Sequence, residues 1–168
     1  KPPALASITT ESRRRDTMFV PDWYMIFRSP PPKSGPLHVL EDPFFKATVN
    51  RQEHFLLITR SEKGFSDGQE ARLVHKNLVE AVAPYLRFRV IVDLRRAKGN
   101  SNNEIEKAIT EVWFPTLIQF SPLAVLVQTA AGRLQVTRMF REQGASGKGF
   151  LSVAEALRHI GLPEDHPL

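Results

Sequence analysis

Residues 90–109, VIVDLRRAKGNSNNEIEKAI, predict a buried strand, a short basic turn and the start of a helix. The uninterrupted apolar run before Asp93 is typical of a strand that is covered on both faces in a mainly parallel sheet. Ser101 and Glu104 form the S-x-x-E pattern of a capping box, so we expect the Ser101 hydroxyl to begin the helix. Phosphorylation of Ser101 is the alternative, because the positive end of the helix would favour a phosphate there, although Glu104 would oppose it.

Strands and helices alternate on both sides of this stretch. Residues 46–50 and 54–60 are β-prone runs with polar residues between them, which predicts a hairpin. Apolar stripes at helical spacing run from Ala71 to Tyr85 and from Ile105 to Phe120, and Pro115 should kink or divide the second helix. Residues 123–129, LAVLVQT, predict another buried strand, and a helix is expected over 130–142.

The carboxyl-terminal part completes the pattern. A glycine-rich loop leads to a short extended piece near Phe150, and Ser152 with Glu155 predicts a capping box for a last helix that ends at Gly161. The resulting order, ββαβαβα(β)α, predicts an α/β fold with an open mixed sheet, a mostly parallel interior and about four helices.

Residues 1–45 differ from the rest of the chain in composition. They contain eight of the thirteen prolines, which favours an extended tail and a domain over residues 46–168. Within this tail, the sequence MFVPDWYMIF concentrates aromatic side chains, which either fold back on their own domain or form a short motif that docks another protein. The candidate partner-binding residues are Phe19, Trp23, Tyr24 and Phe27.

Several of these segments together resemble a STAS domain over residues 46–160. They are the hairpin, VIVDL before a strand-to-helix turn, LAVLVQT, and the closing helix SVAEALRHIGL. STAS domains form anti-sigma-factor antagonists and the cytoplasmic tails of transporters, so the resemblance implies a noncatalytic interaction or regulatory module of bacterial signalling. In that family a phosphoacceptor Ser or Thr, typically in Asp-Ser-Ser/Ala-Gly, begins the helix after the VIVDL strand. Here Ser101 or Asn102 is near that position, but residues 100–104 read NSNNE, so the resemblance implies a divergent member without the usual phospho-switch.

The carboxyl ends of the predicted parallel strands suggest a different function. Ligands of open α/β sheets gather at this edge, where helix N-termini present backbone amides. Basic and polar residues after two successive strands could therefore converge on the phosphate or carboxylate of a small ligand or of an enzyme's substrate. The candidates are Arg95, Arg96, Asn100, Asn102, Thr129, Gly132 and Arg133.

Composition narrows the remaining classes of function. The chain has no cysteine, so it has neither disulfides nor thiolate metal sites, and its five histidines lack metal-binding spacing. No apolar run approaches the roughly 20 residues that span a bilayer, and we expect a cytoplasmic protein. The net charge of +5 permits nucleic-acid binding, but no basic tract is interleaved with aromatic residues, which argues against it. No cofactor motif is present.

The sequence therefore favours a noncatalytic module that binds a protein partner. An enzyme or binding protein for a small anionic ligand is the first alternative. Self-assembly into a homo-oligomer, with the tail of one copy packing on the next, is the second.

Overall fold

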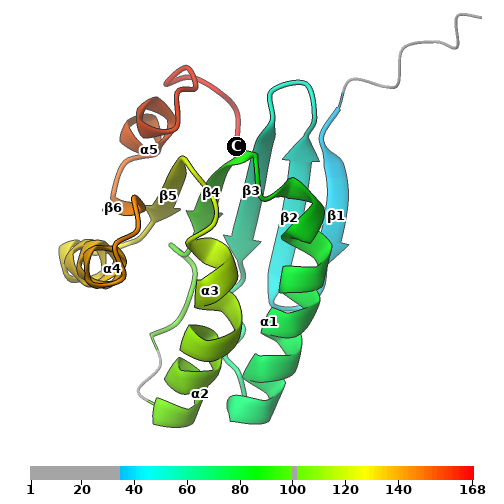
Figure 1. Ribbon diagram of the computed structural model, residues 1–168, viewed down its shortest axis with the longest axis vertical. Coiled ribbons are helices and arrows are strands. Elements are labelled where there is room, and N and C mark those ends of the chain that lie inside the picture. Colours follow the sequence, from blue (N-terminus) through cyan, green and yellow to red (C-terminus); the bar gives the residue numbers. More distant parts are fainter. Residues whose placement is uncertain (1–34, 100–101) are drawn as a thin grey trace, which may run out of the picture. The chain divides into compact units, whose positions relative to one another are not determined.

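The computed structural model describes residues 35–99 and 102–168 (Figure 1). Six strands form one sheet in the order β1-β2-β3-β4-β5-β6. They are β1 Leu37–Glu41, β2 Phe45–Asn50, β3 Phe55–Arg60, β4 Arg89–Asp93, β5 Leu123–Leu126 and β6 Lys148–Phe150. The first three strands are antiparallel, and β3 to β6 are parallel. The prediction of an α/β fold with an open mixed sheet and a parallel interior is confirmed.

Four helical segments connect or follow the parallel strands. The first is α1 Gly68–Val82, followed by the short 3-10 turn η2 Ala83–Tyr85. The second is a continuous stretch made of α2 Asn103–Ala108, the π-helical η3 Ile109–Trp113 and α3 Phe114–Leu117. The third and fourth are α4 Ala130–Glu142 and α5 Val153–His159. Pro115, where we expected a kink or a division, lies inside the second stretch at the start of α3, and π geometry over Ile109–Trp113 ends just before it. The predicted cap of α5 is also present, because the Ser152 side chain accepts a hydrogen bond from the backbone of Glu155.

The sheet begins earlier in the sequence than the proline content indicates. Residues 37–41, which the sequence predicts to belong to the tail, pair with β2 as an edge strand, and the compact unit starts at Gly35. Pro36 and Pro43 flank this strand without interrupting it. Between β1 and β2, the Asp42 carboxylate accepts hydrogen bonds from the backbone N–H groups of Phe44 and Phe45, both at 2.7 Å. This side-chain turn is why the chain reverses direction beside Pro43.

The two faces of the sheet bury different helices. Alternate strand residues such as Val49, Ile58 and Val92 pack with α1, η3 and α3 in the larger core. Figure 1 shows α1 and the α2–α3 stretch side by side over this face. On the other face, α5 packs against β3, β4 and β5 through Leu157 and Ile160. This division follows from the period of two along each strand, which sends successive side chains to opposite faces.

Candidate functional site

The carboxyl ends of β3, β4 and β5 lie at one edge of the sheet, and the loops that follow them lead into α1, α2 and α4. This edge is where the sequence predicts an anion-binding site. The predicted residues that the structure describes are all on two successive crossovers at this edge: Arg95, Arg96, Asn102, Thr129, Gly132 and Arg133. The other predicted site residues lie outside the described residues, and their roles stay predictions: Phe19, Trp23, Tyr24, Phe27, Asn100 and Ser101.

Asp93 ends β4, and its buried carboxylate holds Arg95. The guanidinium donates to the carboxylate at 2.9 Å from Nε and 2.7 Å from Nη2, and the Arg95 backbone N–H donates at 3.1 Å. Burial alone would raise the pKa of Asp93, but the hydrogen bonds from Arg95 outweigh burial and bring the pKa below its ordinary value. The same hydrogen bonds raise the pKa of Arg95. Arg95 is therefore engaged in an internal ion pair.

Asn102 caps α2. The Asn102 side chain accepts a hydrogen bond from the backbone N–H of Glu104 at 2.9 Å, and the helix begins at Asn103. The predicted start on Ser101 is therefore one residue too early. The reason is that Asn and Ser are equally good N-caps, so the spacing to Glu104 alone could not choose between them.

Thr129 has the same role for α4. Its hydroxyl accepts a hydrogen bond from the backbone N–H of Gly132 at 3.1 Å. Two of the predicted anion-binding residues, Asn102 and Thr129, thus satisfy helix amides that an anion would otherwise bind. Arg96 and Arg133 are exposed at the same edge.

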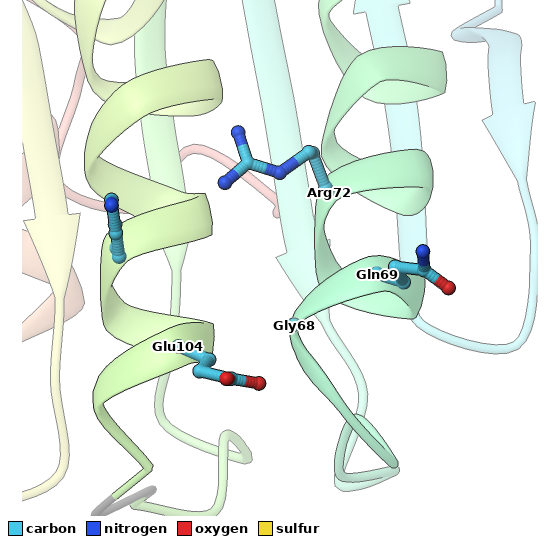
Figure 2. Close-up of a pocket in the computed structure, with 5 residues that line it drawn as sticks. Gly68, Gln69, Arg72 and Glu104 are labelled. Atoms are coloured by element: carbon cyan, nitrogen blue, oxygen red, sulfur yellow. The ribbon is translucent and has the colours of Figure 1, made fainter.

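A groove lies between the first turns of α1 and α2. It has a volume of about 270 Å³ and is lined by Gly68, Gln69, Arg72, Glu104 and Lys107. Figure 2 shows the side chains of Arg72 and Glu104 extending from the two helices into the space between them. A methyl group on Gly68 would lie 3.0 Å from the Cβ of Glu104 and 3.1 Å from its carbonyl oxygen, so the two helices approach closely at this glycine.

The charges around the groove compensate one another. The Glu111 carboxylate lies 2.9 Å from the guanidinium of Arg72 and 3.8 Å from the ammonium of Lys107. Glu111 belongs to the π-helical η3, a geometry that often occurs at functional sites. With two cations and two carboxylates, Glu104 and Glu111, the groove has no excess of either charge. No local pattern in the sequence indicates the groove, because two helix faces must pair to form it.

Arg60, at the end of β3, is the most unusual charged residue of the core. It is only 6% exposed, and its guanidinium donates to the carbonyl oxygens of Phe44 at 3.0 Å and Lys63 at 2.6 Å. The guanidinium carbon lies 4.4 Å from the ring centre of Phe65. Burial lowers the pKa of Arg60, and the nearby Asp42 carboxylate opposes this effect. Arg60 thus connects the β3–α1 loop, at Lys63, to Phe44, directly before β2. The same loop leads into α1 and the groove.

His75 lies beside this cluster, on the buried side of α1. Its Nδ1 is 2.7 Å from the carbonyl oxygen of Ala71, and its ring packs against the rings of Phe45 and Phe65. Burial lowers the pKa of His75, and Arg60 adds to this effect. The hydrogen bond to Ala71 acts in the opposite direction but is weaker. The environment therefore favours neutral imidazole.

α4 differs from the other long helix, α1, in how little of it is buried. Phe140 is its only buried residue, and this ring stacks on Phe114 with the ring centres 5.4 Å apart. The inner side of α4 also touches β6, since a methyl group on Gly149 would lie 2.9 Å from the Arg133 carbonyl oxygen. Leu134 projects from α4 with 66% of its surface exposed, more than any other large apolar residue in the described ranges.

Two further classes of site find no support in residues 35–99 and 102–168. These residues contain no group of His, Cys, Asp or Glu side chains that could hold a metal ion. They also contain no helix with the length and apolar character needed to cross a membrane.

Comparisons of the chain with models of known protein families and with curated protein sequences found no match.

Proposed function

We propose that the chain is a noncatalytic, STAS-like regulatory module that binds a protein partner through the outer face of α4. The STAS-like part of this proposal rests on the sequence resemblance. The location of the binding surface rests on α4. Because Asp93 pairs with Arg95 at the sheet edge and Glu111 pairs with Arg72 at the groove, these four residues are better suited to structure than to chemistry on a substrate.

The observation that carries the proposal is the exposure of Leu134. We define the α4 surface as Ala131, Leu134, Gln135, Arg138 and Arg141, all of which are exposed. Leu134, Arg138 and Arg141 follow one another at spacings of four and three residues, so they form one stripe along the helix. Most of the stability of a protein helix comes from the packing of an apolar face. A helix that buries one side chain and exposes a leucine at its centre is therefore suited to gain packing from a partner.

Two matched variants test this proposal. Leu134→Glu places a charge on the α4 surface, and Leu73→Glu places the same charge on α1, where Leu73 is 61% exposed. Both side chains face solvent, so we expect both variants to fold and to unfold at nearly the wild-type temperature. Full-length wild type and both variants would be immobilised, and the proteins that each retains from native lysate would be quantified by mass spectrometry.

The expected result is a protein retained by wild type and by Leu73→Glu but lost with Leu134→Glu. Equal retention by all three chains would show that the α4 surface does not bind the partner. Retention of nothing above background by wild type would remove the support for an interaction module as a whole.

A further inference from the structure

The charge on and around α4 indicates the chemistry of the partner. Residues 112–154 contain four basic residues and one acidic residue. The basic residues are Arg133, Arg138, Arg141 and Lys148, and the acidic residue is Glu142. All of them are exposed, so this part of the surface has an excess of positive charge. By contrast, the groove between α1 and α2 is balanced by its own ion pairs.

Within the α4 surface, the two arginines differ in their surroundings. Arg138 donates from Nε to the Glu142 carboxylate at 2.6 Å, and the donor and the acceptor are both exposed. Arg141, one turn further along the stripe, makes no ion pair with another of the described residues. An exposed pair such as that of Arg138 and Glu142 contributes little to stability, so a second carboxylate can approach Arg138 at small cost.

The geometry points to an acidic protein segment as the ligand of the α4 surface: an apolar side chain packed on Leu134, with carboxylates beside it that pair with Arg138 and Arg141. This inference rests on the proposed function, because it names the partner chemistry of the same surface. Aspartate and glutamate side chains satisfy the arginines, and one aliphatic or aromatic side chain covers the leucine. Charge complementarity of this kind increases the rate of association and selects among partners.

Two other anionic partners fit this surface less well. Single-stranded nucleic acids bind through aromatic side chains that stack on bases, whereas the exposed large apolar residues of the described chain are aliphatic. Helices that lie in an anionic membrane surface carry a broad apolar face, and the α4 surface has only Leu134. A leucine followed along the stripe by two arginines matches a segment that has both apolar and acidic residues.

Fluorescence anisotropy with labelled synthetic peptides tests the inference. The probe is an acidic peptide with one leucine flanked by glutamates, and the control peptide has glutamine in place of every glutamate. The double variant Arg138→Gln, Arg141→Gln would be compared with Arg51→Gln, Arg87→Gln, which removes two exposed arginines elsewhere on the domain. The full-length chain would be used throughout.

We expect the acidic peptide to bind wild type and the control variant equally, and to bind the α4 variant about three- to tenfold more weakly. Its affinity should fall several-fold when the ionic strength rises from about 0.05 to about 0.2 M, because exposed charge pairs are screened. The glutamine peptide should bind much more weakly. Equal binding of the acidic peptide by both double variants would overturn the inference, as would tighter binding of duplex DNA or anionic vesicles through the same arginines.

The outcome also separates this inference from the proposed function. Loss of a lysate partner with Leu134→Glu but not with the double arginine variant would mean that the α4 surface binds a partner whose chemistry is not acidic. The inference would then fail and the proposed function would stand. If Leu134→Glu also retains the partner, the proposed function itself fails.

Discussion

Replacing Arg60 with methionine would test whether one buried guanidinium holds the β3–α1 loop in place. In the structure this group donates to the carbonyl oxygens of Phe44 at 3.0 Å, Ser61 at 3.3 Å and Lys63 at 2.6 Å. Its carbon also lies 4.4 to 5.3 Å from the ring centres of three phenylalanines. Methionine would keep most of the buried apolar contact but would donate no hydrogen bond.

The expected loss of stability follows from these contacts. Hydrogen bonds from a charged donor contribute about 1.5–3 kcal/mol each, and a desolvated cation over an aromatic ring contributes up to about 2 kcal/mol. The cost of burying the charge, which also lowers the pKa of Arg60, offsets a large part of this sum. We therefore expect the free energy of unfolding to fall by about 3 kcal/mol, which corresponds to roughly 10 °C in Tm for a domain of this size.

Urea unfolding followed by far-UV circular dichroism would measure this change. Arg87→Met is the matched control, because Arg87 is exposed and should change the free energy of unfolding by less than about 0.5 kcal/mol. Arg60→Lys keeps the charge but cannot reach the separate carbonyl oxygens together, so it should be destabilised almost as much as Arg60→Met. A loss below about 1 kcal/mol in Arg60→Met would refute the view that the guanidinium holds this loop.

Three further predictions concern other described residues. Because the pKa of His75 is lowered in the folded state, the unfolded chain binds more protons, and the free energy of unfolding should fall as the pH drops below about 6.5. Urea titrations at about pH 7 and about pH 5.5 should show a smaller fall for His75→Gln than for wild type. Arg95→Met leaves the buried Asp93 carboxylate without its partner and should cost about 1–2 kcal/mol near pH 7. Because Arg95 lowers the pKa of Asp93 in the folded state, this cost should shrink progressively as the pH falls below about 4, the ordinary pKa of an aspartate; a loss that does not change with pH would contradict the ion pair. Gly68→Ala should lower the free energy of unfolding by about 1–2 kcal/mol because its methyl group meets α2, whereas Gly64→Ala, with no atom within 4 Å, should be close to neutral in the same titration.

Local patterns predicted most of the fold. Apolar patterns identified α1, β4 and β5 to within about three residues at each end, because these elements bury residues at a regular spacing, and the expected helix over 130–142 coincides with α4. Proline and capping chemistry pointed to the irregular geometry next to Pro115 and to the start of α5, since both depend on residues that are adjacent in the sequence. The prediction was wrong for β1, where the proline content of residues 1–45 hid a half-exposed edge strand that is specified by its pairing with β2.

The candidate site was harder to predict, because long-range pairing decides which polar groups are available. In the sequence Arg95 looks like an anion ligand, but Asp93 two residues away binds its guanidinium in the fold. Arg60 ends a β-prone run in the sequence, and nothing local to it indicates that it is buried under the β3–α1 loop. Neither the groove beside Gly68 nor the exposure of Leu134 follows from a local pattern, because both depend on how helices meet the rest of the fold.

The anchoring of α4 suggests how binding at its outer face would affect the domain. The inner side of the helix is fixed by Phe140 and by the hydrogen bond that the Gly149 backbone donates to the Thr137 hydroxyl at 3.3 Å. Gly149 belongs to β6, the short strand at one edge of the sheet, and β6 leads directly into α5. A partner that packs on Leu134 would stabilise α4 by mass action and, through these contacts, the β6 edge as well. Protection of β6 amides from hydrogen exchange should therefore rise when the partner binds, whereas β1, at the opposite edge of the sheet, should be unaffected.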